Sequence, residues 1–149
     1  MSIFPAKILL AIDGSEEAGL AAEAATELSR DTGSEVHVTF VLPAPEHLIG
    51  HHWYAPEIRE SILEQAQSEA QKFLEQRAEQ LKSEGAKVVD THLRTGEPDK
   101  EIIRLSEEID ATLIVMGSRG LGAVRRALMG GVSDSVVRHA HCPVLVMRH

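Results

Sequence analysis

Four glycines in the last third of the chain form the pattern best suited to hold an anion. Gly117 and Gly120 follow an apolar run, and Gly130 and Gly131 come directly before an expected helix. Glycines let the backbone turn sharply and approach a ligand closely, while the N–H groups at the start of a helix attract negative charge. Ser133 is placed to cap this helix and can add a hydroxyl donor. The spacing therefore indicates a phosphate site, although purely structural turns explain it equally well.

This glycine pattern differs from the two common nucleotide motifs. No Gly-Lys-Ser/Thr sequence follows at the spacing of a P-loop, and the glycines do not follow the first expected strand, as the dinucleotide fingerprint requires. That strand is followed instead by Asp13, Gly14 and Ser15, and Ser15 is placed to cap the next helix. Asp13 is placed either to contact a ligand or to close a turn with Gly14.

Short apolar runs alternate with longer amphipathic segments along the chain. Strands are expected at 7–12, 36–42, 87–93, 112–116 and 143–147, helices at 15–30, 57–84, 98–109 and 132–139, and a loop at 43–56. Parallel strands need crossover helices, and fully apolar strands need cover on both faces. The expected fold class is α/β: a doubly wound, Rossmann-like, five-stranded and mostly parallel sheet with helices on both faces, in one domain spanning 1–149.

Ligands of such sheets bind outside the carboxyl ends of the strands, where the strand order reverses. Segments 11–15, 41–43 and 116–120 are expected to meet there. The glycine pattern belongs to the third of these segments, so the anion site is expected at this edge of the sheet.

Composition and charge argue against several classes of function. Of the 149 residues, 43% are hydrophobic and 26% are charged, which is ordinary for a globular protein. The formal net charge of −8 argues against a nucleic-acid partner. The apolar run at 8–12 is too short to span a membrane, so no membrane partner is expected. Residues 117–149 carry +4 and the rest −12, which fits either a small-anion site or a solvated basic helix face.

The cysteine and histidine positions favour structural roles. The single cysteine, Cys142, excludes an internal disulfide and, with no targeting segment apparent, favours a cytoplasmic location. It precedes an apolar strand and is expected to be a small core residue rather than a nucleophile. His47, His51 and His52 lie in the expected loop without a carboxylate or thiol at a ligand spacing, so solvent exposure is favoured over metal binding.

Three motifs resemble those of the universal stress protein family. They are KILLAIDGS at 7–15, GEP at 96–98, and GSRG at 117–120 followed after nine residues by GGVS at 130–133 and by RHAHCPVLVM at 138–147. The motifs occur in the family's order and span nearly the whole chain. The glycine spacing is similar to that of the family's ATP-binding branch.

The resemblance implies an adenine nucleotide (ATP, ADP or AMP) as the ligand. Asp13 would reach the ribose hydroxyls, and Val41 would meet the adenine edge through its backbone. Ala11 and Met116 would line the adenine and ribose pocket. A Mg2+ or Mn2+ ion would bridge the phosphates without protein side chains as ligands, and the phosphates would be surrounded by Gly117, Arg119, Gly120, Gly130, Gly131, Val132 and Ser133.

One position departs from the family pattern. The resemblance implies Ser or Thr directly after the last glycine, where this chain has Gly131. Losing a hydrogen bond to a charged group costs about 1.5–3 kcal/mol. Unless Ser133 or water replaces the hydroxyl, affinity is expected to fall by roughly tenfold to a hundredfold.

The resemblance favours a nucleotide-binding module of stress response or signalling, acting on an unidentified protein partner. The alternatives are a nucleotide-free dimeric interaction protein and a slow ATPase. No general base or activating lysine is apparent, so an enzyme is not favoured. The apolar strand at Val144–Met147 would leave an unpaired sheet edge, and a homodimer through it is expected, as the resemblance also implies.

Overall fold

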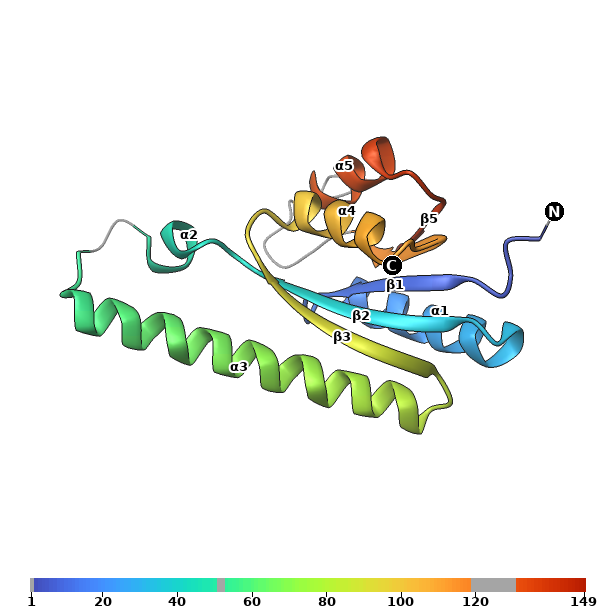
Figure 1. Cartoon of the computed structure of the whole chain (residues 1–149), viewed down its shortest axis with the longest axis horizontal. Helices are drawn as coiled ribbons and strands as arrows, with labels where there is room; N and C mark the ends of the chain where they lie inside the picture. The colour runs from blue at the N-terminus through green and yellow to red at the C-terminus, as the bar shows by residue number, and fades with distance from the viewer. Residues whose placement is uncertain (1, 51–52, 119–130) are drawn as a thin grey trace.

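The sheet of the computed structural model, which describes residues 2–50, 53–118 and 131–149, contains five strands in the order β3-β2-β1-β4-β5 (Figure 1). Every strand pairing in it is parallel. Its strands are β1 Lys7–Ile12, β2 Glu35–Leu42, β3 Lys87–Thr95, β4 Leu113–Gly117 and β5 Val144–Met147.

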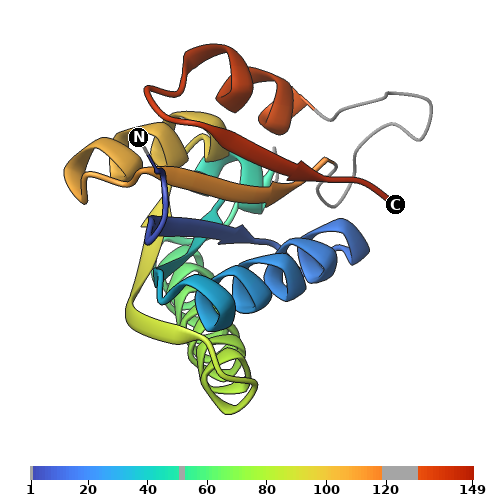
Figure 2. The same cartoon turned by 90° about the vertical axis from the view of Figure 1, so that its right-hand side faces the viewer.

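Helices cover both faces of this sheet, with α1 and α3 on one side and α4 and α5 on the other (Figure 2). They span α1 Glu16–Thr32, α3 Pro56–Ser83, α4 Pro98–Glu108 and α5 Gly131–His139. The doubly wound α/β fold expected from the sequence is therefore confirmed. Within the described ranges, no helix combines the length and apolar character that crossing a bilayer requires.

Successive residues of β1 explain why this strand is almost wholly apolar. Ile8 and Leu10 belong to the core beneath α1 and α3, whereas Leu9 joins Ile114 in the core beneath α4 and α5. All four side chains are fully buried. Because neighbouring side chains of a strand point to opposite faces, these positions of β1 each face an apolar core.

Local signals set the ends of α1. The Ser15 hydroxyl accepts the Ala18 N–H at 3.1 Å, as expected of an N-cap residue. At the other end Gly33 has φ 74°, a left-handed conformation that glycine adopts without a steric cost. The Ser15 cap predicted from the sequence is confirmed.

The expected loop at 43–56 is wrong in part, because it contains a short helix, α2 Pro45–Ile49. Pro45 occupies its first turn, where the missing N–H costs nothing, and Ile49 is buried. His47 lies in the last turn of α2, while positions 51 and 52 are outside the described residues. A helix of little more than one turn is too short to show a hydrophobic period, so the pattern gave no signal.

Candidate functional site

A cavity of about 290 Å3 opens where the carboxyl ends of β1, β2 and β4 meet. This is the point at which the chain order of the sheet reverses, since β1 has β2 on one side and β4 on the other. Many of the predicted nucleotide contacts line it: Ala11, Asp13, Val41, Met116, Gly117, Val132 and Ser133.

The walls of this cavity are mainly apolar. Met116 is buried, and Val41 packs against the core beneath α4 and α5. Pro98 and Ile102, one turn apart on α4, complete the lining on that side. Among the described lining residues, Asp13 is the only ionisable one. Apolar walls with one carboxylate suit a ligand that has an apolar ring and a polar, hydroxyl-bearing part.

Asp13 sits in the turn that joins β1 to α1. Its Oδ1 accepts the Ser15 N–H at 2.9 Å, and Gly14 has φ 85°. The turn-closing role considered for Asp13 is therefore confirmed. The same residue lines the cavity, so the turn holds its carboxylate at the cavity edge.

Gly117, the last residue of β4, has a different role from the sharp turn expected of it. Its φ is not positive. A Cβ at this position would lie 2.7 Å from the carbonyl carbon of Glu17 and 2.8 Å from the Ala18 nitrogen. Gly117 therefore lets the first turn of α1 pack directly against the end of β4.

Ser133 is buried, and its Oγ donates to the Ser118 carbonyl oxygen at 2.7 Å. This bond ties the residue after β4 to the first turn of α5. Because α5 already begins at Gly131, Ser133 lies inside the helix, and its predicted role as an N-cap is wrong. The hydroxyl proton is directed to Ser118, so the backbone N–H groups of this turn are the better candidates for anion contacts.

Gly131 is exposed at the start of α5, and a Cβ there would meet no atom of the described residues within 4 Å. It does not line the cavity itself. The predicted contacts Arg119, Gly120 and Gly130 lie outside the described residues.

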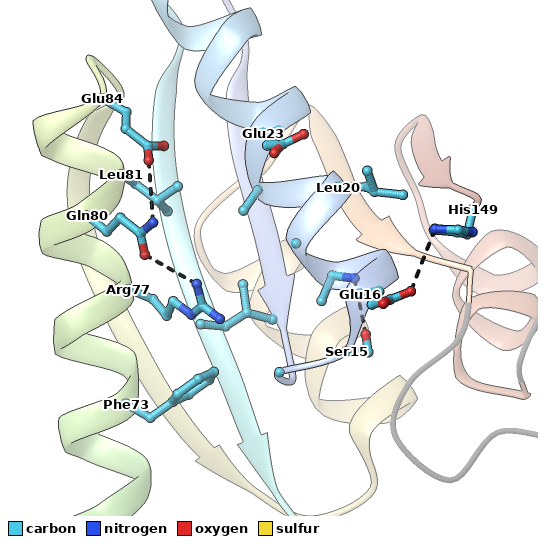
Figure 3. Close-up of a pocket in the computed structure, with 15 residues that line it drawn as sticks. Ser15, Glu16, Leu20, Glu23, Phe73, Arg77, Gln80, Leu81, Glu84 and His149 are labelled. Carbon is cyan, nitrogen blue, oxygen red and sulfur yellow. Dashed lines mark hydrogen bonds and ion pairs between the residues drawn. The ribbon is translucent and has the colours of Figure 1, made fainter.

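A larger cavity of about 560 Å3 lies on the opposite face of the sheet, between α1 and α3 (Figure 3). Its lining includes Leu20 and Glu23 from α1, and Arg77, whose guanidinium donates to Gln80 at 3.2 Å. Among the described residues, none of the predicted nucleotide contacts lines it. We therefore take the smaller cavity as the candidate site.

Cys142 is half-buried and packs against the core beneath α4 and α5, in agreement with the predicted structural role. Burial raises the pKa of its thiol, because desolvation disfavours the thiolate. A thiol with a raised pKa is a poor nucleophile at neutral pH.

The model of the universal stress protein family matches residues 6–148. The chain belongs to this family. A relative from Staphylococcus aureus (strain USA300), named for the same family, is 36% identical over 143 residues, which are 95% of this chain and 82% of the relative.

Solved structures of universal stress proteins share the fold. The protein UspA from Lactobacillus plantarum superposes with a TM-score of 0.79 at 22% identity, covering 96% of this chain and 97% of that one. The universal stress protein from Archaeoglobus fulgidus in complex with dAMP has a TM-score of 0.63 at 26% identity, covering 97% of this chain and 98% of that one.

The family motifs left two parts of the cavity lining unpredicted. Thr39 and Ile102 line the cavity but belong to none of the three motifs. Pro98 was assigned to the GEP motif and to a helix start but not to the ligand site, although it too lines the cavity. The position of Pro98 directly after β3 could have placed it in the cavity, since α4 begins at the same edge of the sheet as the ends of β1 and β4.

Proposed function

We propose that the chain binds an adenine nucleotide in the cavity at the ends of β1, β2 and β4. One observation carries this proposal: Ala11, Asp13, Val41 and Met116, the residues predicted for the adenine and ribose end, all line one cavity. They come from three strands and the turn after β1, so their meeting is a property of the fold and not of one motif.

The known ligand of a relative supports the class of ligand. The Archaeoglobus fulgidus protein, 26% identical, was solved in complex with dAMP. In this chain, the Asp13 carboxylate would accept hydrogen bonds from ribose hydroxyls, and the Val41 backbone would meet the adenine edge. Val132 and Ser133, in the first turn of α5, would present backbone N–H groups to the phosphates.

The cavity volume favours a division of the ligand between inside and outside. At about 290 Å3 it lies at the low end of small-molecule sites, which span roughly 300–1,000 Å3. This volume suits adenosine better than a whole nucleoside triphosphate. The phosphates of ATP would then extend toward the start of α5, where a Mg2+ or Mn2+ ion would be held by phosphate oxygens and water rather than by side chains.

The test is direct. Freshly purified protein is denatured and any released nucleotide is identified by mass spectrometry, and ATP with Mg2+ is then titrated by calorimetry. Asp13→Asn keeps the Oδ1 acceptor for the Ser15 N–H but removes the charge, and it should weaken binding at least tenfold. Asp31→Asn, an exposed acid at the end of α1, is the matched control and should bind normally.

Two results would contradict the proposal. Folded protein that releases no nucleotide and gives no heat with millimolar ATP would move the chain to the nucleotide-free interaction class. Equal affinities of Asp13→Asn and the unaltered protein would place the nucleotide elsewhere.

We also propose that two copies pair through β5. This strand is the last in the sheet order, and all four of its residues are only partly buried. The carbonyls of Pro143 and Met147 accept the N–H groups of Ile114 and Ser118, on the β4 side. Backbone groups of every second residue in a strand point to the same side. The N–H of Leu145 therefore points toward β4, and the N–H of Val146 points to the open edge.

This alternation gives a paired test of the β5 dimer. Val146→Pro removes the N–H of the open edge and should yield a folded monomer in analytical ultracentrifugation, whereas the unaltered chain should sediment as a dimer. Leu145→Pro removes an N–H from the β4 ladder and should destabilise the sheet itself. A Val146→Pro protein that is still dimeric would overturn the proposed interface.

A further inference from the structure

Two histidines and an aspartate meet on adjacent strands, outside the nucleotide cavity. Nδ1 of His37, on β2, lies 3.0 Å from Nε2 of His92, on β3. The two rings stack with centroids 5.3 Å apart and an angle of 20° between their planes. Oδ2 of Asp90, also on β3, lies 3.8 Å from the same Nε2 of His92. All three potential ligand atoms lie within 4.8 Å of one another.

A β-bulge creates this arrangement. Val36 pairs with Val88, but the next residue, His37, pairs with Asp90, so β3 contains one extra residue, Val89. If β3 alternated regularly onward from Val88, Asp90 and His92 would fall with Val88 on the α1 and α3 face, because side chains alternate along a strand. The bulge turns both toward the face that carries His37, a re-aiming of side chains for which bulges are known.

The spacing of the three groups is close to that of a coordination sphere. Imidazole nitrogens bind zinc at about 2.0–2.1 Å and carboxylate oxygens at about 2.0–2.2 Å, so tetrahedral ligand atoms lie roughly 3.3 Å apart. The observed separations of 3.0 Å and 3.8 Å lie on either side of that value. Small rotations about the side-chain bonds would bring the three atoms around one ion.

We propose that His37, Asp90 and His92 form a site for a divalent transition-metal ion of the zinc class. Two imidazoles and one carboxylate are the donors that such ions select. Both imidazoles are half-buried and Asp90 is exposed, so the fourth position opens to water or to an external ligand.

The surroundings hold the ligands and favour a cation. The Thr91 N–H donates to Oδ1 of Asp90 at 2.9 Å and leaves Oδ2 toward His92. Apart from Asp90, the charged groups among the described residues that act on the two imidazoles are Glu35 and Glu108 against Lys7 and Arg94. Arg94 is itself paired with Glu108, so the carboxylate of Asp90 is the local excess charge.

Metal binding would replace the hydrogen bond between the two rings. In that bond one neutral ring donates and the other accepts. An ion needs the lone pair of both nitrogens, so the donating ring must move its proton to its other nitrogen. This is a change of tautomer, and no net proton has to leave the pair.

The experiment uses the full chain, treated with a chelator and free of nucleotide, and titrates Zn2+ in competition with a chromophoric indicator. We expect one ion per chain at this site, with affinity reduced more than tenfold by His92→Gln and by Asp90→Asn. Because the chain has eight histidines, the control replaces His47, His51 and His52 together by Gln and should leave the site intact.

Substitution with Co2+ separates coordination from a structural role. Bound Co2+ should give visible absorption bands that change in Asp90→Asn, whereas urea denaturation of that variant without metal should match the unaltered protein, because Asp90 is exposed. Unchanged Zn2+ affinity in folded His92→Gln and in Asp90→Asn would overturn the proposal. Loss of Zn2+ binding in the control with the three histidine substitutions would also overturn the proposal.

Discussion

Replacing Gly131 by Ser should strengthen nucleotide binding without disturbing the fold. Gly131 is the first residue of α5 and is exposed, and within the part of the chain that the structure describes a Cβ there meets no atom within 4 Å. The family pattern has a hydroxyl residue at this position. Ser at 131 would place that hydroxyl beside the backbone N–H groups that are proposed to face the phosphates.

The expected gain follows from one hydrogen bond. A hydrogen bond to a charged group contributes about 1.5–3 kcal/mol, which lowers Kd by roughly tenfold to a hundredfold. Stability should not fall, because Ser is favoured over Gly in a helix by about 0.5 kcal/mol. Nothing in the open space around Gly131 opposes the new side chain.

The assay is calorimetric titration of ATP with Mg2+ into the unaltered protein, Gly131→Ser and Gly131→Ala. The Ala variant adds the Cβ without the hydroxyl and should bind like the unaltered protein. Equal gains for Ser and Ala would assign the effect to a stiffer backbone. A folded Gly131→Ser protein that binds no more tightly would refute the placement of the phosphates at the start of α5.

Three further predictions concern packing, capping and reactivity. Gly117→Ala should destabilise by about 1–3 kcal/mol in urea denaturation, because its Cβ would overlap the backbone of α1, whereas Gly19→Ala, with open space at its Cβ, should stabilise by about 0.5–1 kcal/mol. Ser15→Ala should cost about 0.5–2 kcal/mol by loss of the cap to Ala18, measured the same way. Alkylation of Cys142 by iodoacetamide should have a pH midpoint above that of an unfolded cysteine peptide and should accelerate on denaturation, because burial raises the pKa of the thiol.

The fold was predictable because its signals are repeated. Strands β1, β4 and β5 are apolar runs, and long helices have start or stop residues such as Ser15 or Gly33. These signals agree with one another, and the parallel sheet with two covered faces follows from them. The order of the strands in the sheet could not be predicted from the apolar runs or from the helix caps, since it depends on which helix packs on which face.

The candidate site was predictable at the residues that the family resemblance assigns. Asp13 and Gly117 stand in motifs, and both line the cavity. The sharp turn expected at Gly117 was wrong, however, because the sequence shows that a side chain is missing but not which atoms need the space. Ile102 gave no signal, since an apolar helix residue that faces a cavity looks the same as one that faces the core.

The histidine cluster shows a different limit of sequence reasoning. An Asp-x-His pair at 90–92 and a histidine at 37 are 53 or more residues apart along the chain. They share a face only because of the extra residue in β3. A regular alternation would place Asp90 and His92 on the opposite face from His37, so the bulge had to be seen before the cluster could be recognised.

The same bulge bears on how the chain would dimerise. The sheet has two edges, β3 and β5, and each could in principle pair with a second copy. β3 is bulged and carries the exposed residues Lys87 and Asp90, features that discourage edge pairing. β5 is short and wholly apolar, with an edge N–H at Val146. Pairing through β5 would remove the edge that the chain does not otherwise protect, while leaving the His37 and His92 face open to solvent and metal.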